Sequence, residues 1–504
     1  MNRINLSGKK RNLLIIICFV FAANVFPQVQ SDSVQLKLTL EDVVALAREQ
    51  SPMATMARHQ FRSSYWEYRT YQASRLPSLT LNSTLPDINR SIDKIVKDDG
   101  SEGFVSRAVM NSSVEMEVSQ NVGLTGGNLF LNSSLARIDN FGDNPDLSYL
   151  SYPFTFGFSQ PINGYNSFKW EKKIEPAKYE EAKKELIHTL EQVSNRAVDY
   201  FFDLILAQIN LEIAKKNFAN SDTLYRIAEG RYQLGTIAEN ELLNMELGFL
   251  NAGTDLNAAN IDLEVRKFRL RSFLGYNEMV DIELILPNEI PEVAIDYGRA
   301  LQEANTNNPE ILAMNRRLLE AEQNVARAKS QKGIQASLFA LYGMSKNADD
   351  IGGVYVDPED QQRLRIGFEI PILDWGLGRG RYKMAQSAQE VVKTNVVQSR
   401  SDFEQQVFLQ VMQFNLQDDQ LLIASKSDTI ADKRYEVTKQ RFLIGRIDVL
   451  ELNDALEAKD VARRGYVQAL RNYWDYFYSL RILTLYDWID KEKLEQDFNE
   501  VLLY

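Results

Sequence analysis

The sequence predicts a mainly α-helical protein with membrane β-strands, built from a duplicated helix–strand–strand–helix unit. Three observations predict this fold: one phrase occurs twice at a wide interval, heptad spacing runs through very long helical segments, and short segments alternate apolar and polar residues. The 504-residue chain is 44% hydrophobic and 25% charged, a composition typical of an ordered protein.

The duplication is visible in two phrases, RYQLGTIAEN (231–240) and RFLIGRIDVL (441–450), which lie 210 residues apart. Two more matches with the same offset indicate an internal repeat. They pair Pro161-Ile162 with Pro371-Ile372, and LRSFLGY (270–276) with LRILTLY (480–486).

Upstream of these matches the spacing of the two copies changes. QSPMATMA (50–57) and NNPEILAM (307–314) are 257 residues apart instead of 210, so the first copy carries 47 additional residues. SVEMEVSQ (113–120) and NLFLNSSLA (128–136) lie in this addition. They are candidates for a further hairpin, in or above a barrel.

Each copy is expected to contain a helix, strands, a long helix, a turn and a return helix. Thr39 is expected to cap the first helix, and the first long helix is expected from about Pro176 to Leu234, where Gly235 ends it. Apolar residues recur with 4,3 spacing from Leu186 to Phe218, which predicts coiled-coil packing between long helices.

The opening of the chain resembles a secretory signal, with a basic segment followed by LLIIICFVFAANVF (13–26). This apolar run is shorter than the ~20 residues of a membrane-spanning helix. The only cysteine, Cys18, lies within it, so the exported chain is expected to contain no disulfide. The net charge of −12 makes nucleic acid an unfavourable partner.

The segments at 151–162 and 363–372 alternate between apolar and polar residues. This period fits a half-buried strand of a soluble sheet, the commoner case, or a lipid-facing strand. Because the chain is expected to be exported and offers no apolar helix to cover the strands, we favour lipid. Four to six strands cannot close a barrel, so copies must pool them. The apolar face of the first segment is expected to hold Tyr152, Phe154, Phe156 and Phe158.

Several phrases, in this order and spacing, resemble the TolC family of outer-membrane efflux proteins. They are LTLEDVVALAREQSP (38–52), ASRLPSL (73–79), FSQPI (158–162), FEIPILDWGLGRG (368–380) and the two repeated phrases. The resemblance implies a homotrimer with a long coiled-coil α-barrel in the periplasm, joined to a transmembrane β-barrel in the outer membrane that trimerisation completes. The family pools four strands per chain into twelve, and the additional strands depart from that pattern.

The expected units follow from the repeat and the resemblance. They are a signal peptide (1–26), a first TolC-like repeat (39–276; strands about 78–160, long helices about 176–274), a linker (277–295), a second TolC-like repeat (296–486; strands about 335–372, long helices about 380–485) and a C-terminal tail (487–504).

The resemblance implies a passive exit duct of a tripartite efflux or type I secretion system. A periplasmic adaptor (membrane fusion protein) would open its tip, and an inner-membrane RND or ABC pump would power it. The alternative is a periplasmic or surface coiled-coil scaffold without a pore. With His59 and His188 as the only histidines, we expect no metal, no cofactor and no enzyme activity.

The two repeated phrases mark the turns of the long helices, which the resemblance places at the periplasmic entrance. Acidic residues after the second turn are expected to form a negative ring, although acids also suit a helix start. The candidate adaptor contacts are Arg231, Gly235, Thr236, Arg441, Gly445 and Arg446, and the candidate pore gate is Tyr232, Glu241, Phe442, Asp448 and Glu451.

Overall fold

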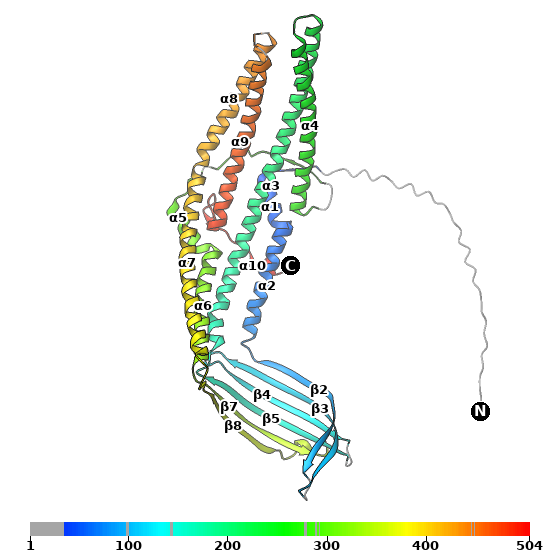
Figure 1. Ribbon diagram of the computed structural model, residues 1–504, viewed down its shortest axis with the longest axis vertical. Helices are drawn as coiled ribbons and strands as arrows, with labels where there is room; N and C mark the ends of the chain where they lie inside the picture. Colours follow the sequence, from blue (N-terminus) through cyan, green and yellow to red (C-terminus); the bar gives the residue numbers. More distant parts are fainter. Residues whose placement is uncertain are drawn as a thin grey trace, which may run out of the picture.

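The computed structural model describes residues 35–503 except 97–99, 142–144, 277–279, 288–289, 292, 445 and 448. The expected signal peptide (1–26) therefore lies outside the described residues. The described chain is elongated, with a sheet at one end and two helical hairpins at the other (Figure 1). No helix in this described part has the length and apolarity needed to cross a bilayer.

Four helices stand side by side on the sheet, in the order α2, α3, α6 and α7 (Figure 1). Above them, α3 pairs with α4, and α8 pairs with α9. The 67 residues of α3 make a rod about 100 Å long. The bounds are α2 (Pro52–Ala73), α3 (Ser167–Gln233), α4 (Glu239–Leu274), α6 (Pro309–Lys332), α7 (Leu377–Asn415), α8 (Gln417–Leu443) and α9 (Val449–Thr484).

Two helices of the first repeat differ from the predicted ones, one by a break and the other by its first residue. The first helix is two, α1 (Leu40–Gln50) and α2, because Ser51 is extended and caps α2 by accepting a hydrogen bond from the Ala54 N–H at 3.1 Å. Thr39 caps α1 as predicted. The long helix α3 begins at Ser167 rather than Pro176, which lies inside it.

The second long helix is interrupted at Leu416, between α7 and α8. The buried side chain of Gln417 donates from Nε2 to the carbonyl of Gln413 at 2.8 Å. A side chain that inserts into the backbone ladder is a known cause of helix bending. Its counterpart α3 is continuous.

The sheet has six strands in the order β2-β3-β4-β5-β7-β8, with every neighbouring pair antiparallel. The additional segments of the first repeat form β3 and β4, between β2 and β5. The strands contain between 11 and 21 residues. Their bounds are β2 (Ser78–Val96), β3 (Glu102–Val122), β4 (Gly127–Asn140), β5 (Asp146–Ile162), β7 (Gln335–Ala348) and β8 (Glu359–Glu369).

The two faces of the sheet differ in polarity. One line of register partners is Leu79, Val118, Leu131, Phe156 and Tyr342. The next line faces the other way and is Thr80, Glu117, Asn132, Thr155 and Gly343.

A bulge in β5 places one residue, Tyr152, on the face opposite to the predicted one. Phe156 pairs with Leu131, but the register shifts so that Tyr152 pairs with Ser134. The additional residue in β5 reverses the alternation, so Tyr152 does not share the face of Phe156.

The remaining described elements hold the two repeats together. The expected linker contains a strand, β6 (Asp281–Leu284), which pairs in parallel with β1 (Gln35–Leu38). In the tail, Phe498 of α10 (Phe498–Leu503) packs on Phe61 of α2 at 5.4 Å between ring centroids. Helix α5 (Tyr297–Asn307) begins the second repeat, and it lies against α7 and α9.

The core is centred where α1, α3 and α9 meet, and it contains a charged cluster. Glu191 of α3 is 0% exposed and pairs with Arg48 of α1 and with Arg481 of α9, whose Nε lies 2.9 Å from Oε2. Arg481 also pairs with Asp487 at 2.5 Å. One carboxylate thus links the first helix of the chain to the last long one. The heptad residues from Leu186 to Ala214 are largely buried, as predicted.

We expect Glu191→Gln to lower the free energy of unfolding by about 3 kcal/mol, because two guanidinium groups lose their buried partner. Urea denaturation followed by circular dichroism measures this change. Glu390→Gln, which removes an exposed pair with Lys393 (2.8 Å), is the control and should change stability by less than about 0.5 kcal/mol. Equal effects of the two substitutions would contradict a central role for Glu191.

Candidate functional site at the helical tip

The two helical turns lie next to each other at the end of the molecule opposite the sheet (Figure 1). One joins α3 to α4 and the other joins α8 to α9. The internal repeat predicted that the two turns are equivalent, and the long helices bring them to the same end.

The first turn ends α3 with a glycine in the left-handed conformation. Gly235 has φ +70 and donates from its N–H to the carbonyl of Tyr232 at 2.8 Å. The N–H of Thr236 donates to the carbonyl of Arg231 at 3.0 Å, and its hydroxyl donates to the same oxygen at 2.8 Å. These bonds form a Schellman motif, which needs glycine at this position.

The second turn repeats part of this pattern. The N–H of Arg446 donates to the carbonyl of Arg441 at 3.0 Å, which matches the bond from Thr236 to Arg231. Gly445 and Asp448, predicted as a contact and a gate residue, lie outside the described residues.

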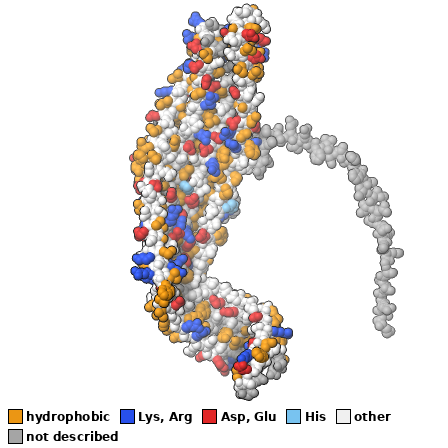
Figure 2. All heavy atoms as spheres, in the orientation of Figure 1, with side chains coloured by type: hydrophobic (Ala, Val, Ile, Leu, Met, Phe, Trp, Pro, Cys, Tyr) orange, Lys and Arg blue, Asp and Glu red, His pale blue; other side chains and the backbone are white. Residues whose placement is uncertain are grey.

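Large apolar side chains are exposed at both turns. Leu234 is 81% exposed and Leu450 is 77% exposed, whereas Tyr232 is 41% exposed. Figure 2 shows apolar side chains mixed with charged ones at this end. Grouped exposed apolar residues are typical of a protein–protein contact.

The equivalent aromatic residues of the two turns are placed differently. Phe442 is 7% exposed and packs with Tyr435, Leu452 and Ala455, against which Leu224 of α3 also packs. Phe442 therefore lies within the apolar cluster of the second hairpin, and it does not project freely as Tyr232 does. Burial raises the pKa of the Tyr435 hydroxyl, which accepts a hydrogen bond from Asn220 Nδ2 at 3.3 Å.

A groove of about 510 Å³ separates the two hairpins. It brings three predicted residues together: Arg231, Glu241 and Phe442. Glu451 lies in the first turn of α9. Sequence reasoning missed most of the lining, because the repeat shows which residues are equivalent and not which face each other. The lining is Leu224, Ile227, Ala228, Arg231, Ile237, Glu241, Asn244, Met245, Phe442, Ile447, Leu450 and Asn453.

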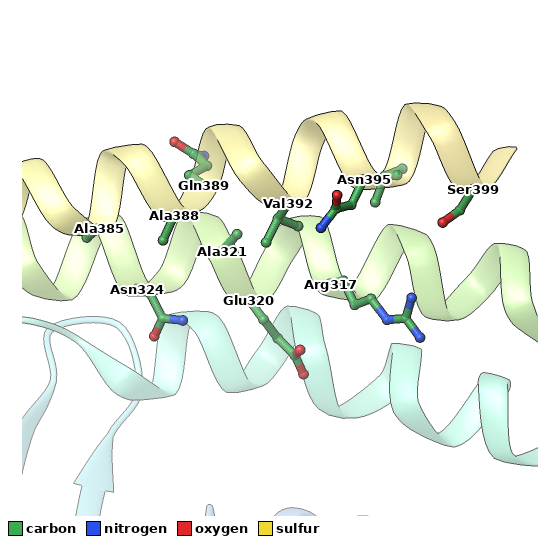
Figure 3. A pocket seen from close by; sticks show the side chains of 11 residues that line it. Arg317, Glu320, Ala321, Asn324, Ala385, Ala388, Gln389, Val392, Asn395 and Ser399 are labelled. Atoms are coloured by element: carbon green, nitrogen blue, oxygen red, sulfur yellow. The ribbon is translucent and has the colours of Figure 1, made fainter. Parts of the chain in front are cut away.

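A second groove runs between α6 and α7, far from the turns. Small side chains, Ala321, Ala385 and Ala388, lie along it with polar residues such as Arg317 and Asn395 (Figure 3). This groove is open and follows the line along which the two neighbouring helices pack together. In the described residues, no group of three or more His, Cys, Asp or Glu side chains is placed to hold a metal ion.

Comparison with known proteins finds a family model that matches one part of the chain. Residues 300–484, which cover most of the second repeat, match the family model described as "Outer membrane efflux protein". The second repeat is therefore similar to outer membrane efflux proteins. No curated relative matches the sequence.

Solved structures share the fold over nearly the whole chain. The CmeC outer membrane channel of Campylobacter jejuni has a TM-score of 0.65 at 14% identity, covering 92% of this chain and 88% of that one. A membrane protein from Pseudomonas aeruginosa has a TM-score of 0.65 at 12% identity, over 91% and 92% of the two chains. The outer membrane protein VceC of Vibrio cholerae has a TM-score of 0.62 at 13% identity, over 90% and 97%.

Gly235→Ala is expected to destabilise the first turn by about 1–2 kcal/mol, because a Cβ is unfavourable at positive φ. Gly230→Ala, a matched change in the last turns of α3, should instead stabilise it by up to about 1 kcal/mol. A Cβ meets nothing within 4 Å at either position, so the backbone conformation alone separates them. Hydrogen exchange of residues 225–245 measures both effects, and the same sign for both would contradict the assignment.

Proposed function

We propose that three copies of this chain form a passive exit duct through the outer membrane, in a tripartite efflux or type I secretion system. The observation that carries the proposal is the sheet: one face is apolar, the other is polar, and both edge strands, β2 and β8, are open. In lipid an open edge leaves backbone groups unpaired, at several kcal/mol each. Pairing between copies removes the edges and directs the polar face to water.

The helical tip would be the periplasmic entrance. Its exposed apolar side chains and the groove between the hairpins offer a contact for the helices of a periplasmic adaptor. Arg231 lines this groove, and Thr236, Arg441 and Arg446 belong to the adjoining turns. Gly235 and Gly445 would set the turns. An inner-membrane RND or ABC pump would supply energy.

Opening would require the second hairpin to move away from the first. Phe442 would act as the latch, since it belongs to the cluster of the second hairpin against which Leu224 of α3 packs. Tyr232, Glu241, Asp448 and Glu451 would line the gate when three copies meet.

The alternative, a coiled-coil scaffold without a pore, predicts no conductance. Purified protein in planar bilayers, together with heat-modifiable migration of the outer-membrane fraction, distinguishes the two functions. Discrete conductance steps support the duct, and a water-soluble protein without conductance supports the scaffold.

Asp448→Asn combined with Glu451→Gln is expected to lower the cation-over-anion permeability ratio at least about twofold, because rings of carboxylates favour cations. Reversal potentials in a salt gradient measure the ratio. Asp255→Asn with Glu264→Gln, which removes the same charge from the middle of α4, is the control and should leave the ratio nearly unchanged. An unchanged ratio in the tip variant would exclude the acidic ring.

A further inference from the structure

The position of the β3–β4 hairpin determines how many strands each chain contributes. Without it, β2, β5, β7 and β8 would give four strands per chain. In the structure, β3 pairs with β2 and β4 pairs with β5 along most of their lengths. We propose that the trimer closes as one eighteen-stranded barrel, six strands from each chain, through pairing of β8 of one copy with β2 of the next. This inference rests on the proposed trimeric duct.

The hairpin is fastened to the ends of two helices that stand on the sheet. Asn166, the N-cap of α3, donates from Nδ2 to the carbonyls of Gly123 and Leu124 at 3.1 Å each. Gln160 Nε2 donates to the carbonyl of Thr125 at 2.9 Å, and Gln120 Nε2 donates to the carbonyl of Arg75, just beyond α2, at 3.0 Å. A hairpin that lay above or inside the barrel would not need these hydrogen bonds to the ends of α2 and α3.

The apolar line of the sheet continues through the hairpin, and the other face is mixed there, with Phe130 beside Glu117 and Asn132. Val118 and Leu131 continue the apolar line from Leu79 to Phe156. Glu117 and Asn132 continue the polar line on the other side. A hairpin withdrawn from the membrane has no reason to keep an apolar face in register with its neighbours.

The stagger of the six strands matches that of a closed barrel. The line of register partners that starts at Ser78 reaches β8 at Arg363, but β8 continues toward the helices to Glu369, six residues farther. At about 3.3 Å per residue and about 4.8 Å between strands, with Ser78 opposite Glu369 of the next copy, this is about 20 Å over the six spacings (about 29 Å) of one chain, an inclination of about 35°. Barrel strands are inclined by about 35–45°. The register line is Ser78, Ser119, Phe130, Gly157, Leu341 and Arg363.

Six strands also match the width of the helices above them. Four helices packed about 9.5 Å apart occupy about 38 Å of circumference per chain. A strand inclined by about 35° occupies about 5.9 Å, so six strands need about 35 Å and four need only about 23 Å. The small side chains between α6 and α7 are consistent with this close helix spacing (Figure 3). With six strands per chain, the β-barrel and the ring of helices therefore have similar circumferences where they join.

The charges near the proposed junction are complementary. Arg363 and Arg365 lie on the polar face of the edge strand β8, while Glu115 and Glu117 lie on the polar face of β3, next to the edge strand β2. When β8 pairs with β2 of the next copy, these groups are two strands apart, about 10 Å. The resulting barrel is about 34 Å across between backbones, against about 23 Å for twelve strands of the same inclination.

The first test labels neighbouring residues on the two faces of β3. In a Cys18→Ser background, Glu117→Cys should react with a charged, membrane-impermeant maleimide at least about ten times faster than Met116→Cys, because only the former faces water. Equal rates for the two variants in a trimer that conducts would overturn the inference and leave the duct intact.

The second test reports which strands are neighbours. The first pair is Asn82→Cys with Arg365→Cys. These two positions are level with each other if Ser78 lies opposite Glu369 of the next copy, so a short bifunctional maleimide should cross-link them into covalent trimers. Thr80→Cys with Thr155→Cys, which would join β2 to β5 within one chain of a twelve-stranded barrel, is the matched control and should not react. The reverse pattern overturns the eighteen-stranded barrel. Loss of both cross-links together with absence of conductance would instead count against the duct itself.

Discussion

Backbone hydrogen bonding at the two edges of the sheet is the constraint on which the rest of the structure depends. A six-stranded sheet with one apolar face is unstable alone in water, since it exposes side chains such as Leu79 and Phe368. It is equally unstable alone in lipid, since the outer sides of β2 and β8 lack partners within the described chain. The association of copies proposed above would satisfy both requirements.

The features that the sequence predicted are those that local chemistry or exact repetition encodes. The phrases around Gly235 and Gly445 could be matched residue by residue, so the reversal of both long helices could be predicted from them. The capping role of Thr39 and the burial of Leu190 and Ala197 follow from short-range rules of the same kind. These rules depend on neighbours within a few residues.

The features that the sequence did not predict depend on contacts between distant segments. The place of β3 and β4 in the sheet depends on pairing with two strands and on the hydrogen bonds that Asn166 donates. The side of the sheet on which Tyr152 lies depends on a bulge that the alternation of residues does not reveal. At the tip, Phe442 and Tyr232 are equivalent by repetition, yet only Phe442 is buried, in a cluster against which Leu224 of α3 packs.

The interruption at Leu416 gives the two halves of each chain different mechanical properties. A continuous α-helix transmits a displacement along its whole length, as α3 does from the sheet to the first turn. The second rod has a break about three-fifths of the way along α7 and α8, where the Gln417 side chain donates to the Gln413 carbonyl. A force applied at the second turn would therefore meet a break in the second rod that α3 does not have.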